Sequence, residues 1–264
     1  MRILNITKWE VRCVGVARQQ EQQGEAGERR DRKLIPTGNE ELDSRIGGGI
    51  PIPSLILIEG DHGTGKSVLV QQITYGALKA GLVVNYITTE STVRELLQQA
   101  KRLSFDMTDW FLMGKLRIYP IHMEGIRWAE EVSKLLLSVV GRFMSLTKDE
   151  WDVFVVDSFS VLAVYANVGA VLDFLTQART LVSEGKVILL TIHPEALKEE
   201  IMVRARSICD GYVKLKIAEV GSRLIKVMEI IKLRGALGLV DSTIAFDVDP
   251  AFGIKVLPLS VARA

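Results

Sequence analysis

Long hydrophobic runs are missing from this sequence of 264 residues, although apolar residues make up 48% of it. Runs such as Leu55–Ile58 and Val187–Ile192 have the length of a strand. They fall far short of the roughly 20 residues that a membrane-spanning helix needs. We therefore expect no transmembrane helix.

Cysteine is also scarce, and neither sign of charge dominates. Cys13 and Cys209 lie far apart without disulfide or metal-site spacing, which favours isolated thiols in a reducing compartment. The start, Met1–Leu4, lacks the basic-then-apolar build of a secretory signal. These features favour a cytoplasmic protein. The net charge of +1 means that no strong field steers nucleic acid to the surface.

Two regions differ in composition. Residues Gln19–Lys33 are polar and almost free of apolar side chains, so they cannot bury enough surface to offset the entropy of ordering. We interpret residues 1–33 as a flexible N-terminal extension and residues 34–264 as one domain. Within that domain, strand-like and helix-like segments alternate up to about Asp210, as in βαβ units around a parallel sheet.

The later part of the domain shows strands and turns only, which predicts antiparallel strands added at one edge of the parallel core. The expected strands are 55–58, 83–88, 116–120, 153–156, 187–191, 212–217, 224–233, 243–248 and 254–258. The expected helices are 65–80, 92–103, 126–144 and 168–183.

One segment fits the phosphate-binding pattern G-x-x-x-x-G-K-[ST]. It reads Gly60, Asp61, His62, Gly63, Thr64, Gly65, Lys66 and Ser67, and it lies between an expected strand and an expected helix. Its glycines let backbone N–H groups surround a phosphate, and the helix N-terminus adds a positive partial charge. Lys66 would reach the β- and γ-phosphates of ATP, and the Ser67 hydroxyl would bind Mg²⁺. His62 occupies a free position of the pattern, and we interpret it as incidental.

A second acidic motif supports this interpretation. The strand 153–156 runs into Asp157, whose carboxylate would emerge at the carboxyl end of the sheet and help to hold Mg²⁺. The next residue is Ser158, where many P-loop ATPases have a catalytic glutamate. The candidate base is therefore Glu90, at the end of the strand after the P-loop helix. The alternative is that Glu90 is an exposed residue that caps the next helix.

Three further residues are candidates for contacts with nucleotide. His193 ends another core strand and would either sense the γ-phosphate or be a loop histidine held by a backbone carbonyl. Lys232 and Arg234 alternate with apolar residues on a late strand and so project from one face. That face is either solvated or offers two cations to the phosphates of a neighbouring subunit.

Together these motifs resemble a KaiC-like member of the RecA superfamily. The lead-in Pro36-Thr37-Gly38, with Leu42-Asp43 and Gly47-Gly48-Gly49-Ile50-Pro51, is similar to that family's approach to its P-loop. The resemblance covers about residues 35–258 and implies an α/β fold, with a mostly parallel sheet flanked by helices and antiparallel C-terminal edge strands. It implies ATP and Mg²⁺ as ligands, and a hexameric ring in which Lys232 and Arg234 contact the neighbour's ATP.

The resemblance also bears on hydrolysis and on partners. KaiC-like proteins carry two adjacent glutamates after the P-loop helix, whereas this chain has Glu90 followed by Ser91, which implies weak or absent hydrolysis. Within the group, Thr191–Pro194 and the ending Phe246–Val256 resemble accessory proteins of the archaellum motor. This implies association with the motor ATPase and its ring scaffold, and attachment to the membrane only through those partners.

The alternative is an active ATPase, either KaiC-like or of the recombinase type. A recombinase needs basic loops that bind DNA. Residues 195–206 mix Glu195, Glu199 and Glu200 with Lys198, Arg204 and Arg206. This mixture would attract phosphate poorly, so the sequence favours a nucleotide-gated subunit.

Overall fold

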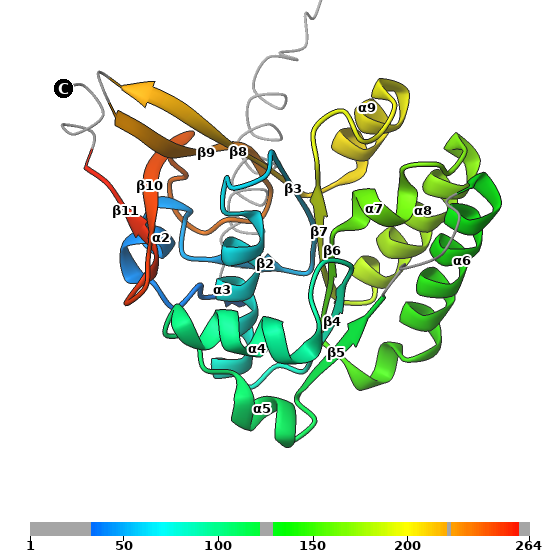
Figure 1. Cartoon of the computed structure of the whole chain (residues 1–264), viewed down its shortest axis with the longest axis horizontal. Coiled ribbons are helices and arrows are strands. Elements are labelled where there is room, and N and C mark those ends of the chain that lie inside the picture. The colour runs from blue at the N-terminus through cyan, green and yellow to red at the C-terminus, as the bar shows by residue number, and fades with distance from the viewer. Residues whose placement is uncertain (1–32, 122–128, 221–222, 259–264) are drawn as a thin grey trace, which may run out of the picture. The chain divides into compact units, whose positions relative to one another are not determined.

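The computed structural model describes residues 33–121, 129–220 and 223–258 (Figure 1). Apart from Lys33, the expected N-terminal extension therefore lies outside the described residues. No helix in the described ranges has the length and apolar character needed to cross a membrane.

The main element of the domain is a nine-stranded sheet in the order β11-β10-β9-β8-β3-β7-β6-β4-β5. The strands from β8 to β5 in this order run parallel, while β9, β10 and β11 are antiparallel to their neighbours. Their bounds are β3 Ser54–Gly60, β4 Val84–Thr88, β5 Leu116–Pro120, β6 Val153–Asp157, β7 Val187–Ile192, β8 Gly211–Val220, β9 Arg223–Leu233, β10 Thr243–Asp249 and β11 Gly253–Val256. The mostly parallel sheet with antiparallel C-terminal strands confirms the expected fold class.

Helices cover both faces of the sheet. Side chains of α3 and α4 pack into one hydrophobic cluster, and side chains of α6, α7, α8 and α9 pack into a second cluster on the opposite face. The helices are α2 Glu40–Arg45, α3 Lys66–Lys79, α4 Val93–Arg102, α5 Thr108–Leu112, α6 Glu130–Leu146, α7 Phe159–Ala163, α8 Val168–Ser183 and α9 Glu199–Ile208. Figure 1 shows α6 and α8 side by side at the right of the sheet.

The central strand β3 shows why two cores form. Its side chains alternate, with Ile56 and Ile58 in the first cluster and Leu55 and Leu57 in the second. Successive strand residues point to opposite faces, so a continuous apolar run predicts a strand buried on both sides. Hydrophobic side chains therefore pack on both faces of the sheet around β3, the strand that leads into the P-loop.

Three details differ from the expectations. The strand β8 is parallel to β3, so only β9, β10 and β11 form the antiparallel edge. The expected helix 126–144 begins instead at Glu130 among the described residues. The short helices α2, α5, α7 and α9 and the small sheet of β1 (Lys33–Ile35) with β2 (Ile50–Ile52) were not expected. Helices of five to ten residues carry too few positions for a 3.6-residue hydrophobic period to be recognised.

Candidate functional site

The P-loop joins β3 to α3 and has the conformation that its glycines predict. Gly65 has a φ of +97° and Gly63 a φ of +76°, which side-chain-bearing residues rarely adopt. A Cβ atom at Gly60 would lie 2.7 Å from the Leu215 carbonyl oxygen. No side chain caps the N-terminus of α3 in the described part of the chain. Its first N–H groups are therefore available to a phosphate.

Lys66 is the buried cation of this loop. Its Nζ donates to the carbonyl oxygens of Gly60 at 2.6 Å and Asp61 at 2.8 Å, and it lies 3.4 Å from His193 Nδ1. Burial lowers the pKa of the ammonium group, and the nearby carboxylates of Glu90, Asp157 and Asp61 partly restore it. Lys66 is thus a desolvated charge whose present partners are neutral groups that a phosphate can replace.

Asp157 is equally buried and ends β6 beside the P-loop helix. Its carboxylate accepts hydrogen bonds from the Thr191 hydroxyl at 2.6 Å and the Tyr86 hydroxyl at 2.8 Å. Burial raises its pKa, against hydrogen bonds from Thr191, Tyr86 and Ser67 that lower it. A carboxylate and a hydroxyl in contact are hard oxygen donors of the kind that Mg²⁺ prefers, so Asp157 and Ser67 fit this ion. There Mg²⁺ would neutralise phosphate charge.

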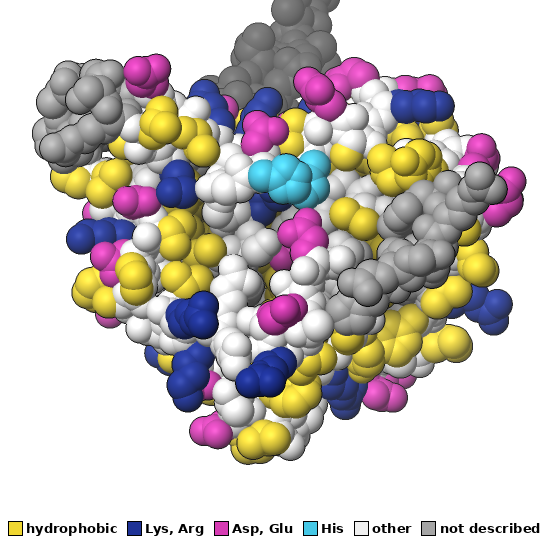
Figure 2. Space-filling model, in the orientation of Figure 1, with side chains coloured by type: hydrophobic (Ala, Val, Ile, Leu, Met, Phe, Trp, Pro, Cys, Tyr) yellow, Lys and Arg dark blue, Asp and Glu magenta, His cyan; other side chains and the backbone are white. Residues whose placement is uncertain are grey.

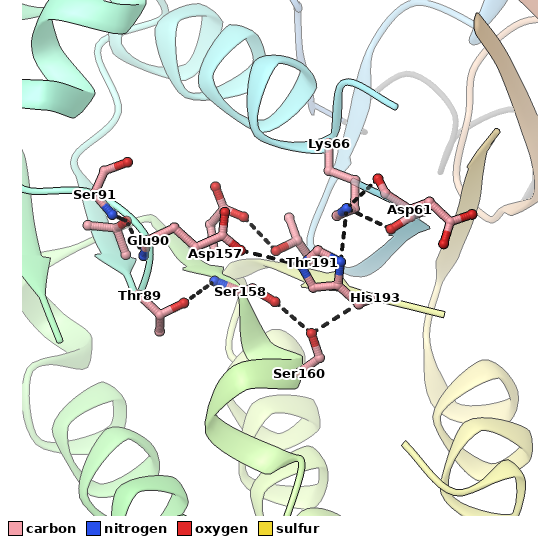
Figure 3. A network of polar contacts seen from close by, with 12 residues as sticks. Asp61, Lys66, Thr89, Glu90, Ser91, Asp157, Ser158, Ser160, Thr191 and His193 are labelled. Atoms are coloured by element: carbon pink, nitrogen blue, oxygen red, sulfur yellow. Dashed lines mark hydrogen bonds and ion pairs between the residues drawn. The ribbon is translucent and has the colours of Figure 1, made fainter. Parts of the chain in front are cut away.

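Hydrogen bonds between strand ends hold this side of the site together (Figure 3). The Ser158 N–H donates to Thr89 Oγ1 at 3.0 Å, and the hydroxyls of Ser158 and Ser160 lie 2.6 Å apart. The His193 backbone N–H then donates to Ser160 Oγ at 3.1 Å. This chain of contacts links the ends of β4, β6 and β7, so their side chains keep fixed relative positions.

Glu90 and His193 form the outer part of the site. His193 Nε2 lies 3.3 Å from Glu90 Oε1, so the imidazole connects Lys66 on one side with Glu90 on the other. The ring contacts these side chains rather than a backbone carbonyl. The Glu90 side chain is 47% exposed, compared with 16% for His193. Burial, followed by the charge of Lys66, lowers the pKa of His193.

Glu90 does not cap the following helix. The Thr92 side chain accepts from the Glu95 N–H, and the Glu95 carboxylate accepts from the Thr92 N–H at 2.9 Å. This reciprocal pair is a complete capping box. The alternative interpretation of Glu90 as a cap is therefore wrong, and its carboxylate is turned toward His193.

His62 is not incidental, because its ring lies against His193 with 4.3 Å between centroids. Figure 2 shows the two described histidines as one patch on the surface of the molecule. The motif pattern missed this contact because its middle positions are unconstrained. Only the fold brings the loop and the end of β7 together.

These residues line one pocket of about 330 Å³. Its lining residues are His62, Gly63, Gly65, Lys66, Ser67, Val68, Glu90, Gln99, His193, Lys226 and Val248. The structure thus brings together the P-loop, Glu90 and His193. Asp157 lies next to them and is hydrogen-bonded to Thr191 and Tyr86. Lys232 and Arg234 do not line this pocket of their own chain.

Lys232 is instead bonded to the end of α9. Its Nζ donates to the carbonyl oxygens of Arg206 and Ser207 at 3.2 Å, and also to that of Cys209. Arg234 is exposed. The sequence placed both residues on one strand, but β9 ends at Leu233 and Arg234 lies in the turn that follows. Lys232 is held within its own chain, and Arg234 is open to solvent.

Sequence reasoning missed Tyr86 and Thr191 as partners of Asp157. The sequence did hold a signal, because residues two apart in a strand point to the same face. Tyr86 therefore shares a face with Thr88, and Thr191 shares one with His193. What the sequence could not supply is the order of the strands, in which β6 lies between β4 and β7.

Comparison with known proteins identifies the family. The family model for the KaiC ATPase matches residues 35–261. The archaeal flagellar ATP-binding protein FlaH of Sulfolobus acidocaldarius is 43% identical over 231 residues, covering 88% of this chain and 100% of that protein. FlaH of Methanocaldococcus jannaschii is 31% identical over 86% of this chain and 97% of that protein.

A solved structure gives the same result. The crystal structure of the flagellar accessory protein FlaH from Methanocaldococcus jannaschii matches with a TM-score of 0.77 and 29% identity, covering 86% of this chain and 100% of that one. The fold and the phosphate loop thus define a KaiC-type ATPase domain of the RecA class, and this chain belongs to that family. Within it, the chain belongs to the FlaH proteins.

Proposed function

We propose that this chain binds MgATP in the pocket around Lys66 and acts as a nucleotide-gated subunit of the archaellum motor, with weak or no hydrolysis. The observation that carries the proposal is the contrast within one site. The phosphate loop, Lys66 and Asp157 are all in place, whereas the single candidate base, Glu90, is half exposed and bonded to His193.

Binding of a phosphate requires Lys66 to exchange its partners. In the structure its Nζ is bonded to two loop carbonyls and lies near His193. Turning toward a γ-phosphate replaces these neutral acceptors by a charged one, which gives a stronger hydrogen bond. The same movement removes the Lys66 contact from His193 and leaves the imidazole free to donate to the phosphate. His193 is therefore suited to sense the nucleotide.

We expect weak hydrolysis because the candidate base, Glu90, is loosely held. A general base must lie within reach of the attacking water and be held in that position. Within the described ranges, the Glu90 carboxylate has one hydrogen-bond partner, His193, at 3.3 Å, and Ser91 stands where the family has a second glutamate. A site that binds but rarely turns over can act as a switch, because ligand stabilises the conformation to which it binds more tightly.

The relatives suggest where such a switch acts. FlaH proteins are named as flagellar ATP-binding proteins, and the partners we propose for this chain are the archaellum motor ATPase and its ring scaffold. Because the described residues contain no membrane-spanning helix, the proposed position at the cytoplasmic face of the membrane depends on these partners.

A hexameric ring is the proposed assembly, with Lys232 and Arg234 acting on the neighbour's ATP. Arg234 is already exposed, but Lys232 must first leave the carbonyls at the end of α9. Light scattering with MgATP should show assembly that the double change Lys232→Ala, Arg234→Ala abolishes. A monomer at every concentration, or a ring that survives both changes, would remove this part of the proposal.

Docking is tested by a pull-down of the motor ATPase and scaffold with three proteins. The wild type and Glu90→Gln should both bind with MgATP present, because both retain the phosphate site. Lys66→Ala should lose the partners. Equal recovery with all three proteins would show that nucleotide does not gate docking.

The second candidate is an active ATPase, KaiC-like or of the recombinase type, and one observation favours it. Glu90 lines the pocket and is half exposed, so its carboxylate is accessible to water. Turnover above about one per second, which is within the usual enzyme range, would support this candidate if Glu90→Gln abolished it. Sequence-specific DNA binding would single out the recombinase type.

A further inference from the structure

We propose that the outer face of α6 is a docking site for an amphipathic helix of a partner protein, with carboxylates along one flank of that helix. We call this face the α6 stripe and define it as Leu135, Val139, Arg142 and Leu146. The apolar members are 63%, 53% and 79% exposed, respectively. Such exposure at three positions of one helix calls for a physical reason.

The spacing of the α6 stripe is that of a helix-pairing seam. Its members follow one another at intervals of four, three and four residues. At 3.6 residues per turn these positions share one narrow face, and the ends of the stripe lie about 16 Å apart along the axis. The same alternation of intervals marks the contact positions of coiled coils. The natural occupant is therefore another helix, of about three turns or more.

The side chains of the α6 stripe do not belong to the hydrophobic core. The opposite side of α6 already supplies Leu137, Val140 and Met144 to the core. Gly141 lies on the side that packs against α8, where a Cβ atom would meet the Gln177 side chain at 2.7 Å. The helix is thus anchored on its inner faces. The apolar stripe contributes nothing to that packing, and Figure 2 shows hydrophobic side chains on the rim over α6.

The charges beside the stripe indicate the chemistry of the partner. Arg142 lies within the stripe, and Lys134 directly precedes Leu135 in the sequence, about 100° around the helix from it; both are exposed. Neither makes an ion pair with any residue of the described ranges, although other exposed cations, such as Lys101 with Asp106, do. A partner helix with apolar contact positions and Glu or Asp along one flank would bury the three apolar side chains and pair the two cations.

A second copy of this chain fits the α6 stripe poorly. Parallel pairing sets Arg142 against Arg142. Antiparallel pairing centred between Val139 and Arg142 leaves each Arg142 opposite Val139 of the other copy, so it provides no acidic partner for that cation. Like charges placed opposite one another are unfavourable. The arrangement therefore favours a different chain over self-association.

The test uses two synthetic helical probes of about 21 residues, or three heptads, with identical Leu contact positions. One probe carries Glu along its flanks and the other carries Lys. Fluorescence anisotropy with the full chain should show binding of the Glu probe and at least tenfold weaker binding of the Lys probe. Val139→Glu should reduce binding of the Glu probe at least tenfold, and Arg142→Glu should shift the preference toward the Lys probe.

Two controls separate this inference from other effects. Met113→Glu changes another apolar side chain, 65% exposed and just after α5, and it should leave binding unchanged. Lys66→Ala should also leave probe binding unchanged, so a failure of the proposed nucleotide function would not imitate a failure here. A reversal of preference by Arg142→Glu cannot result from misfolding, because the variant must be folded to bind the Lys probe.

Several outcomes would overturn the inference. These are equal binding of both probes, absence of binding to either, and an equal loss with Met113→Glu. A change of oligomeric state with Val139→Glu, without probe binding by the wild type, would show that a second copy occupies the stripe. Binding of the wild type to vesicles of anionic lipid, lost in Val139→Glu and without probe binding, would assign the stripe to a membrane.

Discussion

The two ends of the nucleotide pocket are built differently. At the phosphate end, Lys66 is 7% exposed and Asp157 is 6% exposed, and each has at least two hydrogen-bond partners within 3.0 Å. At the other end, the Glu90 side chain is 47% exposed, and its contact with His193 is 3.3 Å long. The chain therefore fixes the groups that bind phosphate more firmly than the group that would activate water.

This difference shows how one fold can separate binding from turnover. Buried groups with fixed hydrogen-bond partners have already lost most of their rotamer freedom, so little binding energy is spent on ordering them, even where Lys66 exchanges its partners. An exposed carboxylate keeps its rotamer freedom and must be ordered before it can act. The comparison predicts that changes at the phosphate end will have larger effects on nucleotide binding than changes at the Glu90 end.

The largest expected effect is that of Lys66→Ala. Charge-assisted hydrogen bonds contribute about 1.5–3 kcal/mol each, so the variant should bind MgATP at least tenfold more weakly. Glu90→Gln is the matched control at the other end and should bind within a factor of about three, which corresponds to less than 1 kcal/mol. Titration with a fluorescent ATP analogue measures both. Unchanged binding by Lys66→Ala would show that the phosphate end of the pocket does not determine nucleotide affinity.

Asp157→Asn should weaken MgATP binding and yet stabilise the ligand-free protein. Burial raises the pKa of Asp157 in the folded state, so folding disfavours its charged form at neutral pH. The amide removes this cost, and a gain of about 1 kcal/mol corresponds to roughly 2–4 °C in Tm for a domain of this size. Thermal unfolding without Mg²⁺ measures the gain.

The sign of this effect also fixes its pH dependence. Lowering the pH protonates the wild-type carboxyl group in the folded state before it does so in the unfolded state. The Tm difference between Asp157→Asn and the wild type should therefore shrink on acidification. A variant that is less stable than the wild type at pH 7 would show that the carboxylate is stabilised in the ligand-free fold.

Thr92→Ala and Glu90→Gln separate capping from catalysis. Loss of the Thr92 side chain removes the capping box of α4 and should cost about 1 kcal/mol of unfolding free energy. Glu90→Gln should stay within about 0.5 kcal/mol of the wild type, because Glu90 caps nothing. Urea unfolding measures both variants. A larger loss in Glu90→Gln would assign Glu90 a structural role after all.

The smallest expected effect is proton uptake by His193. Burial and Lys66 lower its pKa in the ligand-free site, and a phosphate nearby would raise it, so the protonated imidazole favours binding. MgATP affinity should therefore rise modestly as the pH falls from about 7.5 to about 6, around the ordinary histidine pKa. Calorimetry in buffers of different ionisation enthalpy measures the uptake. His193→Gln should show none, and equal uptake in the two proteins would assign the proton to another group.

The sequence predicts some parts of this molecule well for physical reasons. The strand Leu116–Pro120 and the helix Val168–Ser183 have the bounds that their apolar periods predict. Gly60–Ser67 lies between strand and helix as its motif requires, because a phosphate loop is a local structure.

Contacts between distant segments were harder to predict. The parallel pairing of β8 with β3, the His62–His193 contact and the Tyr86 bond to Asp157 all depend on which strands become neighbours. No local pattern encodes that order. The capping box at Thr92 does have a local signature, with Glu95 three residues later, and it could have excluded Glu90 as the cap.

The most direct test of the central claim, that this site holds ATP without rapid turnover, is the chemical state of the bound nucleotide. The protein is incubated with radiolabelled MgATP, separated from free nucleotide, and the bound fraction is resolved into ATP and ADP. The account predicts mostly intact ATP, with the same result for Glu90→Gln and little bound nucleotide for Lys66→Ala. Bound ADP in the wild type, replaced by ATP in Glu90→Gln, would contradict it and identify Glu90 as the base of an active ATPase.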